Sequence, residues 1–313
     1  MRPQRAIFVG SKNLGLEIFK VLLDSSSDTT WVAVHPDDKR DSRSCLSSWQ
    51  QLAESRNIPF VVARSNSELS EVVKEFKPDL GMVCGWYRII ESSLLELFPL
   101  GLWGIHNSLL PRYRGGSPLV WSIMNGDSEV GSSVFKFDAG IDSGPILFQV
   151  AVRNTPSLTV ADLLAQIQRL LVDRLPDAWS QLINGTAICS TQDEAEATYC
   201  GQRLESDGEI NWFESATQIH NFIRALAFPY PGAFSEFERK RLFLSETSVV
   251  PGVYFGTPGQ VLRRDTDYVV ISCGGNSGLL VRNVTLEGVR SPAPQILASI
   301  SCRLGRNSFK QIS

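Results

Sequence analysis

The first half of the chain alternates short apolar runs with amphipathic segments, and this alternation restricts the fold more than any other feature. The segments between the runs have the three- to four-residue apolar spacing of helices. The runs typical of buried strands cover residues 5–10, 29–35, 59–63, 78–86 and 102–106. Such alternation predicts a doubly wound, mainly parallel α/β sheet of the Rossmann-like class, with helices on both faces.

The pattern changes in the last third of the chain. Residues 193–208 are polar and contain several glycines, which predicts a linker. A single helical segment over 214–226 follows, and then come short alternating runs separated by turns. These runs are typical of a small β-rich open barrel of the OB-like type. We therefore expect one domain over residues 1–192 and a second over residues 209–313.

Two helical segments carry local predictions. The amphipathic segment over residues 159–185 contains Pro176, and a proline inside a helix removes a hydrogen bond and clashes with the preceding turn. We expect a kink or a break at that residue. A second, short helix over residues 92–98 begins at Ser92, which we expect to act as its N-cap.

The composition narrows the class of protein. The formal net charge is −3 and the pI is about 5.7, which argues against a broad surface for nucleic acid. No apolar stretch approaches the ~18 residues of a membrane span, and no signal-peptide core follows the start. The six cysteines are scattered without a CxxC pair, which is typical of free thiols in a reducing cytoplasm and not of a zinc site. We predict a cytoplasmic protein without a metal, and the oligomeric state stays open.

One of the three histidines stands where chemistry is expected. His106 falls at the carboxyl end of the predicted strand over 102–106, and ligands of open α/β sheets bind outside such strand ends. A basic loop punctuated by proline and glycine, "NSLLPRYRGG", follows over residues 107–116. A neutral imidazole can accept a proton near neutral pH. The alternative is a strand-end histidine whose ring is satisfied by backbone groups.

A second loop, "FDAGIDSG" over residues 137–144, carries the carboxylates of Asp138 and Asp142. A carboxylate beside an imidazole can orient the ring or relay its proton. The alternative is that both residues only form turns beside glycine.

These loops together resemble the folate-dependent N-formyltransferase family. The stretch "IHNSLLPRYRGGSPLVWSIMNGDSEVGSSVFKFDAGIDSG" over 105–144 carries the resemblance, and "EATYCGQRLESDGEINW" with "NFIRALAFPYPGAFS" continues it past the linker. The family includes methionyl-tRNA formyltransferases and sugar N-formyltransferases, and the chain looks most similar to UDP-aminoarabinose formyltransferases. The resemblance implies a formyltransferase catalytic domain over residues 1–192 and 10-formyltetrahydrofolate as co-substrate.

The resemblance also implies roles for particular residues. His106 and Asp142 match the catalytic histidine and aspartate, and Asn107 is a third catalytic candidate. Ile89 and Ile90, after "GWYR", match the wall and backbone that hold the pterin. The "SLLPRYRG" segment matches its floor, and the loop over residues 138–142 matches the main chain that reads its edge. The residues expected to bind the co-substrate are Arg88, Ile89, Ile90, Leu109, Pro111, Asp138, Ala139, Gly140 and Ile141.

Gly104 departs from the family pattern. That pattern is Asn-x-His, with the amide directed at the oxyanion, and residues two apart on a strand share a face. Loss of such a donor costs ~10²- to 10³-fold in rate. We expect the glycine to leave room for a water molecule or a bulkier acceptor, or else to permit a close approach of backbone. Asn107 can replace the missing amide only if the strand has already ended there.

The acceptor is a separate question. Methionyl-tRNA formyltransferases of the family carry a long, lysine-rich insertion after the second strand, whereas residues 35–49 here, "HPDDKRDSRSCLSSW", are short and of mixed charge. Lys39, Arg40 and Arg43 are typical of a solvated loop. With the acidic balance, this favours a small-molecule amine over tRNA. The best fit is an aminosugar on a nucleotide; an amine of a peptide or siderophore precursor also fits.

Three alternatives remain open at this stage. A 10-formyltetrahydrofolate hydrolase is motivated by Gly104, because the hydrolase domain of the family's folate dehydrogenases also lacks the asparagine. A methionyl-tRNA formyltransferase is the second. A silent folate-binding protein is the third, and retention of both His106 and Asp142 argues against it.

Overall fold

The computed structural model describes residues 4–36 and 43–305. The chain divides into two compact units, which are described separately below. The first unit contains residues 1–118, 131–152 and 165–201, and the second contains residues 119–130, 153–164 and 202–313.

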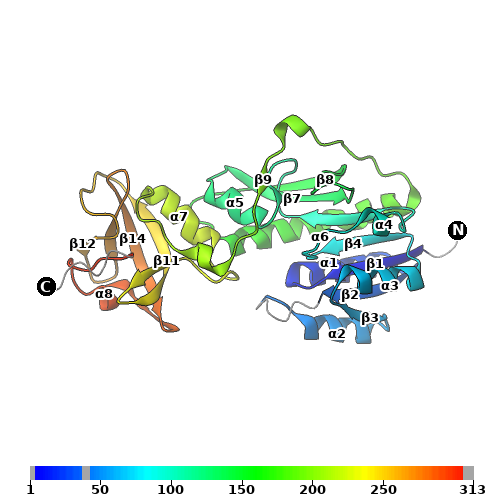
Figure 1. Cartoon of the computed structure of the whole chain (residues 1–313), viewed down its shortest axis with the longest axis horizontal. Coiled ribbons are helices and arrows are strands. Elements are labelled where there is room, and N and C mark those ends of the chain that lie inside the picture. The colour runs from blue at the N-terminus through cyan, green and yellow to red at the C-terminus, as the bar shows by residue number, and fades with distance from the viewer. Residues whose placement is uncertain (1–3, 37–42, 306–313) are drawn as a thin grey trace. The chain divides into compact units, whose positions relative to one another are not determined.

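The first unit is built on a mainly parallel sheet (Figure 1). Within the described residues the sheet has seven strands in the order β3-β2-β1-β4-β5-β7-β8. Strands β1 to β5 pair in parallel, and β7 runs antiparallel to β5. The strands are β1 (Gln4–Gly10), β2 (Thr29–Pro36), β3 (Phe60–Ala63), β4 (Leu80–Cys84), β5 (Leu102–His106), β7 (Glu129–Lys136) and β8 (Ile146–Arg153). The predicted doubly wound class is confirmed.

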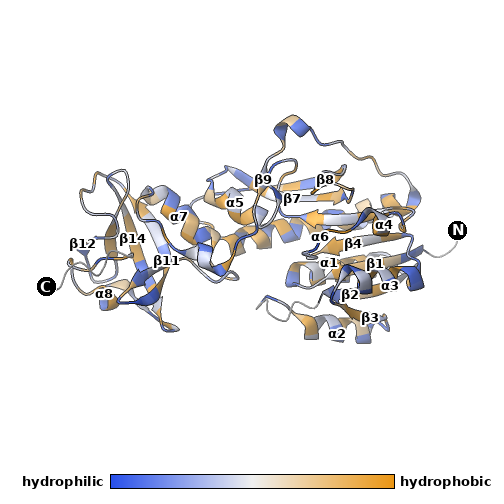
Figure 2. Cartoon of the chain, in the orientation of Figure 1, coloured by the Kyte–Doolittle hydropathy of each residue, from blue (hydrophilic) through white to orange (hydrophobic). Residues whose placement is uncertain are grey.

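The apolar runs of the sequence form the interior of this sheet. Ile7, Val34 and Leu80 are completely buried, and Figure 2 shows β1 and β4 coloured mainly as hydrophobic. Continuous apolar strands are typical of a parallel sheet covered on both faces, because neither face meets water. The sheet therefore holds the strand ends, and the loops that follow them, on a rigid frame.

Helices connect the strands, and two of them differ from the sequence predictions. Ser92 is the first residue of α4 and not its cap: Glu91 precedes the helix, and no side chain caps it. Helix α6 runs unbroken through Pro176, so the predicted break is absent. Leu175 and Trp179 on either side of the proline are buried, and this packing offsets the lost backbone hydrogen bond. The helices so far are α1 (Asn13–Ser25), α2 (Leu46–Ser55), α3 (Asn66–Phe76), α4 (Ser92–Leu95), α5 (Pro118–Met124) and α6 (Val160–Asn184).

The second unit contains an antiparallel sheet, which confirms the prediction of a β-rich C-terminal part. In the described residues its strands follow the order β10-β11-β14-β13-β12, and β15 pairs with β14. None of the helices described is long and apolar enough to cross a membrane. The elements are α7 (Ala216–Ala225), β10 (Phe234–Phe237), β11 (Lys240–Val250), β12 (Val261–Arg264), β13 (Val269–Cys273), β14 (Ser277–Leu286), β15 (Val289–Pro292) and α8 (Ala293–Ile296).

His220 on α7 is buried in this unit with both ring nitrogens bonded. Its Nδ1 lies 2.9 Å from Thr247 Oγ1, and its Nε2 lies 2.8 Å from the carbonyl oxygen of Pro156. Burial is the main cause that lowers the pKa of His220 below its ordinary value of 6.5. The folded protein therefore favours the neutral ring, and this contribution to stability is present above about pH 6.5 and lost as the pH falls through the lowered pKa.

We expect a fall in pH to lower the free energy of unfolding of the wild type more than that of a His220→Gln variant. Between about pH 7 and about pH 5 the wild-type free energy of unfolding should fall more steeply than that of the variant, which has no ring to protonate. Urea unfolding followed at several pH values measures the difference. Parallel curves for the two proteins would show that the buried ring does not contribute.

Candidate active site

His106 is the last residue of β5, and its ring is held by the loop that follows. The backbone N–H of Ser108 donates to the His106 carbonyl oxygen at 2.8 Å, so the strand ends there in a tight turn. The His106 ring is buried, and its Nε2 lies 2.7 Å from the carbonyl oxygen of Tyr113. A carbonyl oxygen only accepts, so Nε2 carries the hydrogen. In the neutral ring, Nδ1 is then the basic nitrogen.

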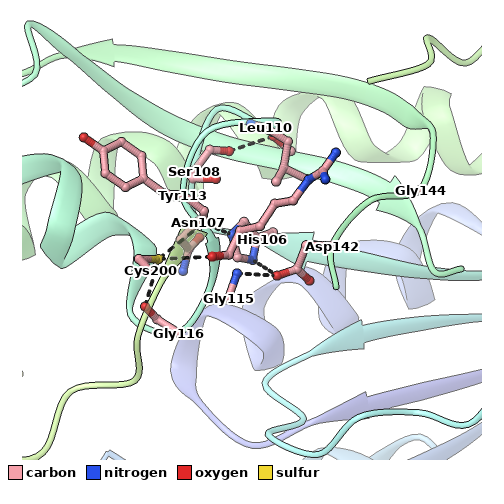
Figure 3. A network of polar contacts seen from close by, with 12 residues as sticks. His106, Asn107, Ser108, Leu110, Tyr113, Gly115, Gly116, Asp142, Gly144 and Cys200 are labelled. Carbon is pink, nitrogen blue, oxygen red and sulfur yellow. Dashed lines mark hydrogen bonds and ion pairs between the residues drawn. The ribbon is translucent and has the colours of Figure 1, made fainter. Parts of the chain in front are cut away.

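Asp142 lies on the side of the ring that carries this basic nitrogen. Its Oδ2 is 3.5 Å from His106 Nδ1, and the same oxygen accepts a hydrogen bond from Gly115 N at 2.8 Å. Figure 3 shows dashed lines from the carboxylate to both His106 and Gly115. The structure thus brings the two predicted residues together. The expectation that Asp142 holds the imidazole is only partly met, because the Tyr113 carbonyl makes the shorter contact with the ring.

The loop after His106 is anchored to strands β7 and β8. Ser133 on β7 bonds to both ends of the "SLL" turn: its hydroxyl accepts from Leu110 N at 3.1 Å and donates to Ser108 O at 2.7 Å. Gln149 on β8 donates to Leu110 O at 2.9 Å. Side chains from two strands therefore satisfy the polar groups of the loop backbone, which makes the loop a firm support for the Tyr113 carbonyl.

A segment beyond α6 completes the support. Residues 192–200 cross the basic loop as a strap, and β6 (Arg114–Gly115) pairs in parallel with β9 (Tyr199–Cys200). Gly115 has a φ of +102°, and a Cβ there would lie 2.5 Å from the Cys200 carbonyl oxygen, so only glycine fits. Most of this strap falls inside the predicted linker, and no pattern in its sequence predicted a place at the site.

The Cys200 thiol faces the same loop and contacts its backbone carbonyl groups. Its Sγ lies 3.1 Å from the Gly116 carbonyl oxygen and 3.4 Å from that of Arg114. Burial, and then the charge of Asp142, raise the pKa of Cys200 to about 11. The protonated thiol therefore serves as a donor near neutral pH.

Asn107 follows the break in the strand, which was the condition for it to serve at the site. The Ser132 hydroxyl lies 2.9 Å from His106 O and 3.2 Å from Asn107 Oδ1. The oxygen of the Asn107 amide is thus turned to β7.

Gly104 does not leave open space, and this part of the sequence prediction is wrong. A Cβ at position 104 would lie 2.4 Å from Cε2 of Phe137 and 3.1 Å from Cε1 of Phe135. In the register of the antiparallel pair Gly104 stands opposite Phe135, so the two rings from β7 and its end fill the face where the family carries an amide. What approaches the glycine closely is two aromatic side chains, and not the backbone expected as the alternative.

Two of the residues expected to hold the pterin expose large apolar side chains. Ile89 is 76% exposed and Ile141 is 53% exposed, each in a loop of the first unit. Ile90, in contrast, packs into the core beneath the sheet end, so only its backbone remains for a ligand. The guanidinium of Arg88 lies over the Trp86 ring, with 5.2 Å between them. Exposed isoleucines of this kind suit a flat, partly apolar ligand.

The remaining predicted residues lie in the two loops. Leu109 and Pro111 are half-buried, whereas Ala139 and Gly140 are exposed. The Asp138 carboxylate accepts from Gly140 N at 3.0 Å and from Ser143 Oγ at 2.8 Å. The Asp138 carboxylate is thus engaged within the turn itself. Among the residues described, no group of three or more His, Cys, Asp and Glu side chains is placed to hold a metal ion.

Known proteins match the chain along most of its length. Residues 5–178 match the formyl transferase family, and residues 204–299 match the formyl transferase C-terminal domain. The methionyl-tRNA formyltransferase of Desulfotalea psychrophila is 32% identical over 288 residues, which cover 91% of this chain and 88% of the relative.

Solved structures share the fold. An N-formyltransferase from Helicobacter canadensis, in complex with folinic acid and dTDP-3-aminofucose, has a TM-score of 0.68 at 19% identity and covers 89% of this chain and 99% of its own. The methionyl-tRNA formyltransferase of Clostridium thermocellum has a TM-score of 0.55 at 23% identity and covers 78% and 93%. With both family domains in order along it, the chain belongs to the formyl transferase family, the folate-dependent N-formyltransferases that its sequence resembles.

Proposed function

We propose that this enzyme transfers the formyl group of 10-formyltetrahydrofolate to the primary amine of a small acceptor, a nucleotide-linked aminosugar. The observation that favours a small acceptor is the short connection after β2. β2 ends at Pro36 and α2 begins at Leu46, so there is no length for the lysine-rich insertion of methionyl-tRNA formyltransferases. Lys39 and Arg40 lie outside the described residues.

The charges of the second unit support the same acceptor. Four of its cations are engaged in ion pairs with carboxylates, whereas binding of tRNA depends on cations that neutralise phosphates. The pairs are Lys240 with Glu287 at 2.8 Å, Arg241 with Glu205 at 2.8 Å, Arg263 with Asp265 at 3.0 Å, and Arg290 with Glu246. A phosphate backbone would have to displace these carboxylates.

A methionyl-tRNA formyltransferase is the second candidate. The relative from Desulfotalea psychrophila favours it, because it is 32% identical over nearly the whole chain. The Helicobacter canadensis structure, which holds dTDP-3-aminofucose, favours the small acceptor. The two candidates differ in how their rates respond to salt, which makes them separable.

In the proposed mechanism some residues of the site bind the folate and others transfer the proton. Ile89 and Ile141 pack against the pterin, and the main chain of residues 138–142 binds its polar edge. The acceptor amine attacks the formyl carbon, a C–N bond forms, and the bond from that carbon to N10 of the folate breaks. His106 Nδ1 accepts the proton that the amine loses, and N10 receives a proton on leaving.

Asp142 and Asn107 stabilise the two charged species of the reaction, the imidazolium and the oxyanion. The imidazolium formed by protonation of His106 Nδ1 faces the Asp142 carboxylate 3.5 Å away, which stabilises it. The Asn107 amide, together with backbone N–H groups, supplies the donor for the oxyanion in place of the family's missing asparagine.

A panel assay tests the acceptor. The protein and 10-formyltetrahydrofolate are incubated with nucleotide-linked aminosugars or with methionyl-tRNA, and the products are followed by mass spectrometry. We expect an aminosugar to be formylated at a rate that changes little between low and moderate salt. Counterion release would make a tRNA acceptor lose ~10³- to 10⁵-fold in affinity over that range.

Two outcomes of this assay would contradict the proposal. Formylation of methionyl-tRNA with a steep loss of rate in salt would identify the second candidate. Consumption of the folate at the same rate without any amine would identify a hydrolase instead.

The cysteines support a cytoplasmic location as part of this proposal. Cys45, Cys84, Cys189, Cys200, Cys273 and Cys302 are all free. Free thiols are typical of a reducing compartment.

A further inference from the structure

Gln192, at the start of the strap, joins the basic loop to the aspartate loop. Its side chain is buried and uses both ends of the amide. Oε1 accepts from Arg114 Nε at 3.1 Å and from Arg114 Nη2 at 2.9 Å. Nε2 donates to the carbonyl oxygens of Asp142 at 2.8 Å and Gly144 at 2.7 Å. One amide therefore ties together two loops that the sequence separates widely.

The Arg114 end of this link is firmly fixed. Its side chain is 1% exposed, and it donates to Glu194 at 2.7 and 2.9 Å and to the Tyr199 hydroxyl at 3.1 Å. Glu194 and Tyr199 both belong to the strap. Bidentate contacts of this kind hold a guanidinium in one orientation, so Arg114 gives Gln192 a rigid anchor.

The Asp142 end of the link needs outside support. Asp142 has a φ of +51°, in the left-handed region that residues with a side chain rarely adopt. The contacts of Gln192 with Asp142 O and Gly144 O hold the backbone that directly follows the Asp142 Cα. Gly115, the neighbour of Arg114, donates to the Asp142 carboxylate. The contacts thus close a ring around Asp142: side chain to Gly115, backbone to Gln192, and Gln192 to Arg114.

We propose that Gln192 is a positioning residue for catalysis. By holding the left-handed backbone of Asp142 it sets that carboxylate against His106 Nδ1, and the strap after α6 thereby becomes part of the active site. The inference rests on the proposed function, since it takes His106 and Asp142 as the reacting pair.

The Gln192→Glu variant separates the two ends of the link. A glutamate still accepts from Arg114, but its oxygens cannot donate to Asp142 O or Gly144 O, and they repel both. A displacement of ~1 Å at a reacting group can cost ~10²-fold in rate, so we expect kcat for formyl transfer to fall by ~10- to 100-fold. The KM for the folate should change by less than kcat falls, because the variant frees only the Asp142 end of the main chain that binds the pterin and leaves Ile89 in place.

Two matched variants control for charge and for folding. Gln181→Glu introduces the same negative charge at an exposed position of α6, and we expect its kcat to stay near that of the wild type. The double variant Gln192→Glu with Glu194→Gln restores the net charge and leaves Arg114 one carboxylate. It should show the same loss of kcat with a thermal midpoint close to the wild type. A wild-type kcat in either protein carrying Gln192→Glu would overturn the proposal.

A double-mutant cycle with Asp142→Asn distinguishes a role in positioning Asp142 from a purely structural role. It compares the loss of kcat caused by Gln192→Glu in the wild type and in Asp142→Asn. If Gln192 acts through Asp142, adding Gln192→Glu to Asp142→Asn should cause little further loss of kcat. An equal loss in both backgrounds would show that Gln192 acts elsewhere. Near-normal turnover of Asp142→Asn alone would instead contradict the proposed function, so the two failures are distinguishable.

Discussion

The His106→Ala and Asp142→Asn variants should each lose formyl transfer by ~10²- to 10⁴-fold in kcat at saturating folate, the range expected when a general base is removed. The reason is geometric: His106 Nε2 is occupied by the Tyr113 carbonyl, so Nδ1 is the nitrogen left to accept the proton. Asp142, 3.5 Å from Nδ1, stabilises the charge that results. Steady-state turnover with the acceptor found by the panel assay measures both variants.

A surface change of the same type controls for this experiment. Asp173 on α6 is exposed, so Asp173→Asn should keep wild-type kcat. His106 and Asp142 are proposed to act together in one step. The loss of kcat in the double variant His106→Ala with Asp142→Asn should therefore be much smaller than the product of the two single losses. Near-normal turnover in either single variant would remove that residue from the reaction.

The Gly104→Asn variant should unfold more easily than the wild type, by about 1–3 kcal/mol, because it forces atoms into a packed site. Even the Cβ would lie 2.4 Å from the Phe137 ring, and the amide is larger still. Urea unfolding measures the change. The double variant with Phe137→Ala makes room for the amide, so we expect it to regain part of the stability that Gly104→Asn loses.

The same pair of variants tests what the rings do in the reaction. Residues 104 and 106 share a face of β5, so an amide admitted by Phe137→Ala would lie beside the reacting centre and should raise transfer relative to Phe137→Ala alone. An unfolding midpoint of Gly104→Asn equal to that of the wild type would show that the rings do not fill this space.

Short-range patterns in the sequence predict much of the fold and part of the site. The apolar runs predict the parallel sheet because a strand that is buried on both faces is apolar along its whole length, which can be recognised from the sequence. His106 and the two aspartates could be selected because each follows an apolar run, at the edge where ligands of such sheets bind. Asn107 could be considered on the single condition that β5 ends at His106, which the Ser108 contact satisfies.

Contacts between distant parts of the chain decided the rest. Phe137 fills the face of Gly104 only because β7 pairs with β5 in one register, and no local pattern specifies which ring meets which glycine. Helix α6 continues through Pro176 because its neighbours are buried, with Trp179 stacked on Trp31 of β2. A local rule for proline cannot contain that tertiary contribution.

The residues of the proposed catalytic motif could therefore be selected from the sequence alone, whereas their arrangement was decided by the tertiary structure. The tautomer of His106 depends on the carbonyl of Tyr113, and the left-handed backbone of Asp142 depends on Gln192. A backbone carbonyl has no side-chain signature, and a polar segment such as 193–208 has the composition of a linker whether it is free or bound. Only folding brings the strap onto the basic loop, because the hydrogen bonds between them join groups that are far apart in the chain. These groups find their partners only when the whole unit has folded.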